Sequence, residues 1–229
     1  MKKYLIVIIM GVFLSTACES KIENIIAIDV LLTPSEELNK HSILLNSLIK
    51  ENNPSTLQLD ENHIPHITLL QCFVKESDLP EIIKSLEGLF EAVKDESFNA
   101  SKIVYDKETE DSFAMIQVDN SLVLADVHSR VIDQLKPFIV QNGSQESFVP
   151  NPDGSPINKF TVDYVPNFVE KYSYENFDPH ISLGTANKLY LDSLARNVFQ
   201  PIQFKAPSLA IYQLGDFGTA QKKIWVSTP

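Results

Sequence analysis

The spacing of hydrophobic residues changes along the chain between two periods, one typical of strands and one typical of helices. Apolar residues alternate from Ile26 to Leu32, with Asp29 on the opposite face, which predicts a strand over 24–32. The capping sequence Thr33-Pro34-Ser35-Glu36 follows, with proline at the first helical position. Because apolar residues then recur at helical spacing, we expect a helix to about Lys50.

The same two periods divide the rest of the chain. The expected strands are 66–74, 98–105, 113–118, 180–185, 209–214 and 223–226. The expected helices begin at Asp78, Leu122 and Lys188 and run to about 93, 139 and 199. No change of composition marks a second domain, so we expect one α+β domain over 24–229 with two similar β/α halves.

A long segment without clear periodicity precedes the strand at 180. Residues 141–156 are rich in Gly, Pro, Asn and Ser, and we expect a loop that continues to 176, with a short strand hidden at 160–165. Loops of this length in a compact domain are often functional. The sequence leaves open whether the segment closes over a site.

The first eighteen residues have the organisation of an export signal. Two lysines precede an apolar run from Tyr4 to Leu14, and small residues lead from there to Cys18. Eleven apolar residues are too few to cross a bilayer, which takes about 20 helical residues. The segment resembles a bacterial lipobox, so we expect a signal peptide over 1–17, a lipidated Cys18 with a tether over 18–23, and a location in the cell envelope. The alternative is a plain signal peptide that leaves Cys18 as a free thiol.

Composition indicates which kind of protein this is and which partners are unfavourable. The chain has 229 residues, 44% of them hydrophobic, which is enough to bury a substantial core. The formal net charge of −11 argues against a partner that is a long nucleic acid. The 2 cysteines cannot form a disulfide framework, and Cys72 fits a buried strand position. We expect a monomer.

One short motif occurs twice, once in each half of the chain. Pro65-His66-Ile67-Thr68-Leu69 recurs as Pro179-His180-Ile181-Ser182-Leu183, each time at the start of an expected strand. Because side chains alternate on a strand, the histidine and the hydroxyl residue of each motif share one face, about 6.6 to 7 Å apart. Two such strands side by side would present two imidazoles and two hydroxyls to one groove.

This set of groups suits the cleavage of a phosphodiester. One neutral imidazole can accept a proton from the attacking hydroxyl, and one imidazolium can donate a proton to the leaving oxygen. Hydroxyl groups can stabilise the charge that develops on the phosphate oxygens. The scheme needs no metal and no cofactor, and both forms of histidine are populated near neutral pH.

The paired motifs resemble those of the 2H phosphoesterase superfamily, which includes RNA 2′,5′-ligase and 2′,3′-cyclic phosphodiesterase types. The resemblance implies a bilobal α+β fold with a pseudo-twofold, two antiparallel-rich sheets flanked by helices, and a central groove. It implies that His66 and His180 are catalytic and that Thr68 and Ser182 bind the substrate phosphate. The acidic charge and the export signal favour a small cyclic nucleotide or an RNA-end 2′,3′-cyclic phosphate over RNA ligation. The alternative is a non-catalytic lipoprotein that binds a phosphorylated ligand or a protein partner in the same groove.

The other histidines and the aromatic residues before the second motif carry weaker expectations. His63 and His66 are a poor metal pair, because Pro65 prevents a helix and no carboxylate or thiol supports them. His41 and His128 continue apolar helical stripes and are interpreted as packing residues. A base could stack on Tyr172, Tyr174 or Phe177, and Tyr164 is a fourth candidate; the alternative is that these rings cover the core.

Overall fold

The computed structural model describes residues 23–227. The predictions for the signal peptide and for Cys18 concern residues outside this range. Between residues 23 and 227, no helix is both long and apolar enough to cross a membrane.

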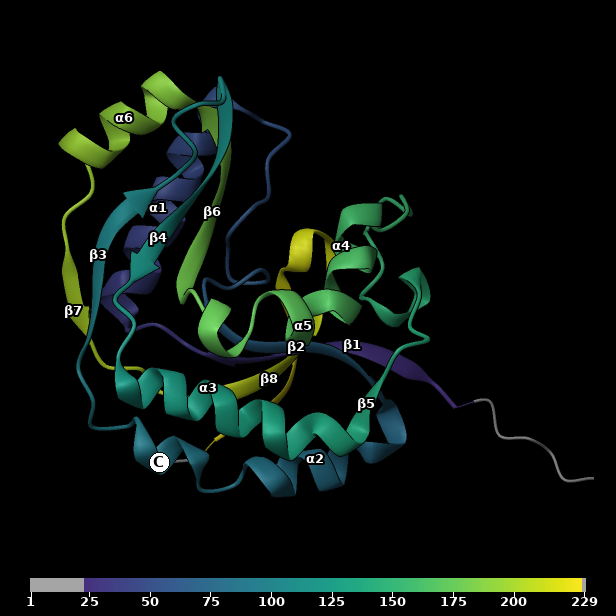
Figure 1. Cartoon of the computed structure of the whole chain (residues 1–229). Helices are drawn as coiled ribbons and strands as arrows, with labels where there is room; N and C mark the ends of the chain where they lie inside the picture. The colour runs from purple at the N-terminus through teal and green to yellow at the C-terminus, as the bar shows by residue number, and fades with distance from the viewer. Residues whose placement is uncertain (1–22, 228–229) are drawn as a thin grey trace, which may run out of the picture.

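Two antiparallel sheets form the framework (Figure 1). The five-stranded sheet has the order β5 (Ile139–Val140), β2 (Ile67–Lys75), β1 (Ile25–Leu32), β8 (Leu209–Leu214) and β9 (Ala220–Val226). The four-stranded sheet has the order β6 (His180–Asn187), β4 (Asp111–Val118), β3 (Phe98–Val104) and β7 (Ile202–Phe204). The α+β class with two antiparallel sheets flanked by helices is therefore confirmed.

Helices cover one face of each sheet, and in two cases a helix that follows a strand of one sheet packs against the other sheet. α1 (Glu36–Asn52) follows β1 but packs against β6 of the other sheet, beside α6 (Lys188–Asn197). α3 (Leu122–Leu135) follows β4 but packs against β2, and α2 (Leu79–Leu86) lies beside α3. Figure 1 shows α2 and α3 below the five-stranded sheet. Since one apolar cluster includes residues of both sheets and of these helices, the two halves share a core.

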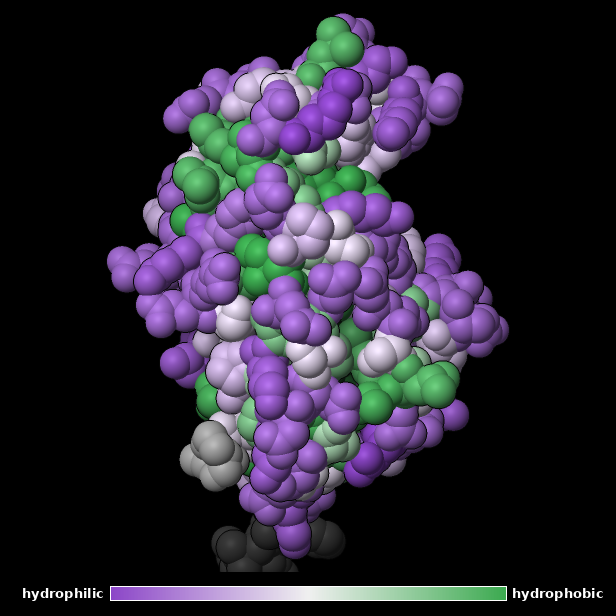
Figure 2. Space-filling model, turned by 90° about the vertical axis from the view of Figure 1, so that its left-hand side faces the viewer, coloured by the Kyte–Doolittle hydropathy of each residue, from purple (hydrophilic) through white to green (hydrophobic). Residues whose placement is uncertain are grey.

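The outer surface is mainly polar. Figure 2 views the molecule from the side on which α6 and β7 lie, and hydrophilic residues cover most of this face. Hydrophobic residues appear there in separate patches. This distribution agrees with the acidic composition of the chain.

The start of α1 differs from the predicted capping box. The N-cap residue is Ser35, whose hydroxyl accepts a hydrogen bond from the Leu38 amide at 3.3 Å. Thr33 instead contacts Ser208, with the two hydroxyl oxygens 2.7 Å apart. The pattern placed the helix correctly, but Ser35 takes the capping role expected of Thr33.

Two predicted helices end early. The helix expected to reach residue 93 stops at Leu86, because Gly88 adopts a left-handed φ of 82° before a short 3₁₀ turn. The helix expected to reach residue 139 stops at Leu135, shortly before Pro137, which has no amide hydrogen to continue it. Ile139 then enters β5, a strand that the sequence analysis missed along with β7 because both are very short.

The expected strand over 160–165 is wrong. This segment forms α4 (Lys159–Tyr164), which Asn158 caps by accepting a hydrogen bond from the Phe160 amide, and α5 (Phe168–Lys171) follows. Both lie beside the five-stranded sheet in Figure 1. Apolar residues of the segment join a small cluster with residues of β1, β2 and β8; they are Phe148, Ile157 and Val165. The long segment is therefore packed against the sheet.

Candidate active site

The two motifs meet from different sheets. The first lies at the start of β2, the second at the start of β6, and the two strands contact each other without being hydrogen-bonded neighbours. The two strands therefore lie against each other as expected, while each pairs within its own sheet. In both motifs the histidine and the hydroxyl residue are half-buried, whereas the intervening isoleucine is buried, as the alternation predicts.

Both histidines are held by the same backbone contact. His66 Nδ1 lies 2.8 Å from the carbonyl oxygen of Ile64, and His180 Nδ1 lies 2.7 Å from that of Asp178. Because a carbonyl only accepts hydrogen bonds, each Nδ1 carries a hydrogen, and Nε2 is the ring nitrogen that gains or loses a proton. In both motifs the carbonyl belongs to the residue two positions before the histidine. The repeated sequence therefore has a repeated local structure.

A β-bulge follows the hydroxyl residue in both motifs. Thr68 pairs with Leu31, but Leu70 pairs with Val30, so Leu69 has no partner residue on β1. In the same way Ser182 pairs with Met115 and Gly184 with Ala114, which leaves Leu183 as the extra residue. Leu69 and Leu183 are both fully buried. A bulge redirects side chains and is common next to active sites.

Glycine is required at the second bulge. Gly184 has a φ of 115°, a conformation that other residues rarely adopt, and a Cβ there would collide with the Thr56 hydroxyl. That hydroxyl accepts a hydrogen bond from the Thr185 amide at 2.7 Å. These contacts fix the backbone conformation immediately after Ser182.

Asp29 on β1 belongs to the site, although the sequence analysis did not select it. Its side chain is fully buried. Asp29 Oδ2 accepts hydrogen bonds from the Thr68 hydroxyl and from the Gln71 amide, both at 2.9 Å, and lies 3.3 Å from His66 Nε2. A carboxylate in an otherwise apolar strand was the available indication, because a buried charge needs partners.

The two histidines are shifted in opposite directions. Burial acts to lower the pKa of His66, but the hydrogen bond and the negative charge of Asp29 outweigh it and raise that pKa. Burial lowers the pKa of His180, and the charge of His66 lowers it further. The site therefore has one imidazole that favours the protonated form and one that favours the neutral form.

The aromatic candidates have different surroundings. Tyr172 and Tyr174 are 38% and 39% exposed, whereas Phe177 is 7% exposed. Phe177 stacks on His128 with ring centroids 3.9 Å apart, so packing occupies its face. Tyr174 donates a hydrogen bond from its hydroxyl to Asp133 of α3. These contacts leave Tyr172 as the best of the three for base stacking.

Tyr172 is itself paired with another tyrosine. Its ring stacks on Tyr164 with centroids 4.5 Å apart. Burial, Tyr172 and the charge of Asp29 all raise the pKa of the Tyr164 hydroxyl.

His128 links the first motif to the segment that precedes the second. Its Nδ1 lies 2.8 Å from the Leu69 carbonyl oxygen, and its Nε2 accepts a hydrogen bond from the Tyr174 amide at 3.0 Å. Burial lowers the pKa of His128 to about 4, so the ring is neutral. The packing role expected for His128 is confirmed.

The remaining histidines and Cys72 lie outside the paired motifs. His63 Nδ1 is 2.9 Å from Asp60 Oδ1, and the His41 ring lies against Phe199 with centroids 5.7 Å apart. Cys72 is buried, which raises the pKa of its thiol, as expected for a strand residue. Over residues 23–227, no three His, Cys, Asp or Glu side chains form a group suited to a metal.

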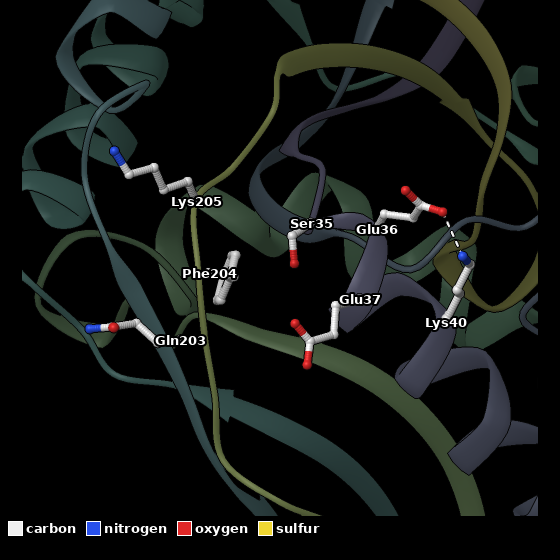
Figure 3. Close-up of a pocket in the computed structure, with 7 residues that line it drawn as sticks. All are labelled: Ser35, Glu36, Glu37, Lys40, Gln203, Phe204 and Lys205. Carbon is white, nitrogen blue, oxygen red and sulfur yellow. Dashed lines mark hydrogen bonds and ion pairs between the residues drawn. The ribbon is translucent and has the colours of Figure 1, made fainter.

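A separate hollow lies at the start of α1. Figure 3 shows its lining, which includes Phe204 of β7 and Ser35. Glu36 and Lys40 form an ion pair there at 2.5 Å. No motif residue lines this hollow, so it is distinct from the candidate active site.

Comparison with known proteins identifies the family. The model of the 2′-5′ RNA ligase superfamily matches residues 48–216, which include both histidine motifs. The chain therefore belongs to this superfamily of 2H phosphoesterases. Asp29 and all of β1 precede the matched segment.

Individual relatives are distant. No curated protein matches the chain. Among solved structures, the chain is similar to Usb1 of Kluyveromyces marxianus, with 13% sequence identity and a TM-score of 0.36. The match covers 87% of this chain and 98% of the Usb1 chain.

Proposed function

We propose that the protein is a phosphodiesterase in which His66 is the general acid and His180 the general base. The contact of buried Asp29 with His66 Nε2 carries the proposal, and the opposite directions of the pKa shifts of the two histidines agree with it. A general acid must hold its proton near neutral pH and a general base must have lost it. Asp29 favours the first state at His66, and burial favours the second at His180.

The proton movements follow from this assignment. His180 Nε2 accepts a proton from the attacking water as its oxygen bonds to phosphorus. His66 Nε2 donates a proton to the leaving oxygen as the bond between that oxygen and phosphorus breaks. The elements of water are thus added across one phosphoester bond. The Ser182 hydroxyl, two residues from His180, is suited to stabilise the charge on the non-bridging oxygens. The Thr68 hydroxyl would do the same after releasing the hydrogen bond that it donates to Asp29.

Asp29 acts as a positioning residue in this scheme. It contacts His66 and Thr68 through the same oxygen, so one buried carboxylate orients an imidazole and a hydroxyl together. Its charge also stabilises the imidazolium before the proton is transferred.

A small phosphodiester suits the charge of the protein. The net charge of −11 repels a long polyanion, whereas a 2′,3′-cyclic nucleotide carries a single negative charge. We further propose that Cys18 is lipidated and holds the enzyme at the periplasmic or extracellular face of the cell envelope. Mass spectrometry of the envelope fraction tests this, and an unmodified Cys18 would exclude it.

Turnover of 2′,3′-cyclic nucleotides in the presence of EDTA tests the enzymatic proposal. We expect hydrolysis by the wild type and little by His66→Ala or His180→Ala. His63→Ala is the matched control, because His63 contacts Asp60 outside the paired motifs. Binding of nucleotide without turnover in the wild type would favour the alternative of a non-catalytic ligand-binding lipoprotein.

A further inference from the structure

The two halves differ at one pair of equivalent positions. We align the two sheets at their bulges and compare the second residue pair after the bulge. In the five-stranded sheet this pair is Asp29 with Gln71. In the four-stranded sheet the corresponding pair is Phe113 with Thr185. One half therefore has a buried carboxylate where the other half has an aromatic ring that is 43% exposed.

Phe113 shares the face of the second motif. On β4, Gln117 pairs with His180, Met115 with Ser182 and Phe113 with Thr185. Alternate residues of a strand lie on one face, so Phe113, Met115 and Gln117 form a row beside the motif. Phe113 is displaced from the Ser182 level by about 7 Å along the strand, a displacement comparable to the span of one nucleotide.

A surface hollow follows this row. Its lining includes Val104, Phe113 and Met115, and it continues to Gln117 and Asp178. The Asp178 carbonyl holds His180 Nδ1, so this end of the hollow borders the residue that precedes the second motif, although no residue of the motif lines the hollow. Polar and acidic residues, Asp106, Asp111 and Ser112 among them, share the lining with Phe113, so the exposed ring and Met115 supply an apolar surface within a mainly polar hollow.

We infer that Phe113 and Met115 bind the nucleobase of a substrate whose phosphate lies at Ser182 and His180. This inference rests on the proposed function, since it places the base relative to the reacting phosphate. Stacking on an aromatic face accepts any base, and the methionine thioether adapts to a flat ring. Tyr172 is less suited, because Tyr164 already covers one of its faces.

Binding of adenosine 3′-monophosphate and of inorganic phosphate to the full chain, measured by calorimetry, tests the inference. Phe113→Ala should weaken the nucleotide about 10- to 100-fold, the range for one stacked base, and leave phosphate binding unchanged. Phe113→Trp should restore the nucleotide affinity, whereas Phe113→Leu should not. Phe160→Ala is the matched control, because Phe160 is 71% exposed on α4 and does not line the hollow.

The outcomes separate this inference from the catalytic proposal. Nucleotide binding that depends on Phe113 in a protein without turnover would support the inference and refute the catalytic proposal. Turnover of 2′,3′-cyclic adenosine monophosphate with the same KM in wild type and Phe113→Ala would support catalysis and overturn the inference. An equal loss of phosphate and nucleotide binding in Phe113→Ala would also overturn it.

Discussion

Asp29 Oδ2 lies 3.3 Å from His66 Nε2, and the carboxylate that carries it is fully buried on the neighbouring strand. The second histidine has no such neighbour at the equivalent position, where the chain has Phe113. This difference distinguishes His66 from His180 in two otherwise matched motifs, and under the proposed mechanism it makes His66 the acid and His180 the base.

Replacing Asp29 by asparagine should lower the pKa of His66. The substitution keeps the size of the side chain and removes the negative charge that opposes the effect of burial. An NMR titration of the histidine ring protons should show His66 titrating at lower pH than in the wild type. An unchanged His66 titration would mean that Asp29 does not set its charge.

Removing either motif histidine should lower turnover by about 10²- to 10⁴-fold, the usual contribution of a general acid or base. His66→Ala with His180→Ala together should cost much less than the product of the single losses, since the two groups act as a unit. Steady-state kinetics on a 2′,3′-cyclic nucleotide measures both effects. Full activity in either single variant would assign that histidine a structural role.

The motif hydroxyls should contribute less than the histidines. Ser182→Ala should lower kcat by about 10- to 10³-fold, at or below the usual loss for one oxyanion donor, while Ser182→Thr should retain activity. Thr68→Ala should fall in the same range. Comparison of kcat for these variants checks this, and wild-type kcat in both alanine variants would exclude a role in phosphate stabilisation.

Neutral His128 should make the fold sensitive to acid. Its pKa is about 4 in the folded protein, below the ordinary value of 6.5, so its contribution is complete above pH 6.5 and is lost as pH falls toward 4. The loss amounts to about 3 kcal/mol at 1.36 kcal/mol per pKa unit. Urea unfolding from pH 7 to pH 4 measures it. His128→Phe should be less stable at pH 7 and should lack this part of the pH dependence; an unaltered slope would contradict the assignment.

Local patterns predicted most of the elements. The alternation from Ile26 to Leu32 and the two histidine motifs placed β1, β2 and β6 to within a residue or two, because strands at the core repeat a simple period. The helical conformation of 160–165 was missed, because its stability depends on a cap at Asn158 and on packing against the five-stranded sheet.

Long-range pairing limited what could be predicted of the candidate site. The sequence repeat identified His66 and His180, but the contact between β2 and β6 arises from two separate sheets. Asp29 lies thirty-seven positions before His66 and joins it only through the pairing of β1 with β2. The residues that contact Asp29 could therefore not be predicted from the spacing of residues in the sequence.

The pH dependence of kcat/KM for a 2′,3′-cyclic nucleotide, measured with and without EDTA, tests the central claim most directly. A neutral His180 and a protonated His66 are both required, so the profile should be bell-shaped. The acidic limb should reflect the lowered pKa of His180 and the basic limb the raised pKa of His66, as macroscopic values of the coupled pair. EDTA should leave the profile unchanged. A rate that rises steadily through about pH 9, well above the ordinary histidine range, or that EDTA abolishes and a divalent cation restores, would contradict two-histidine catalysis.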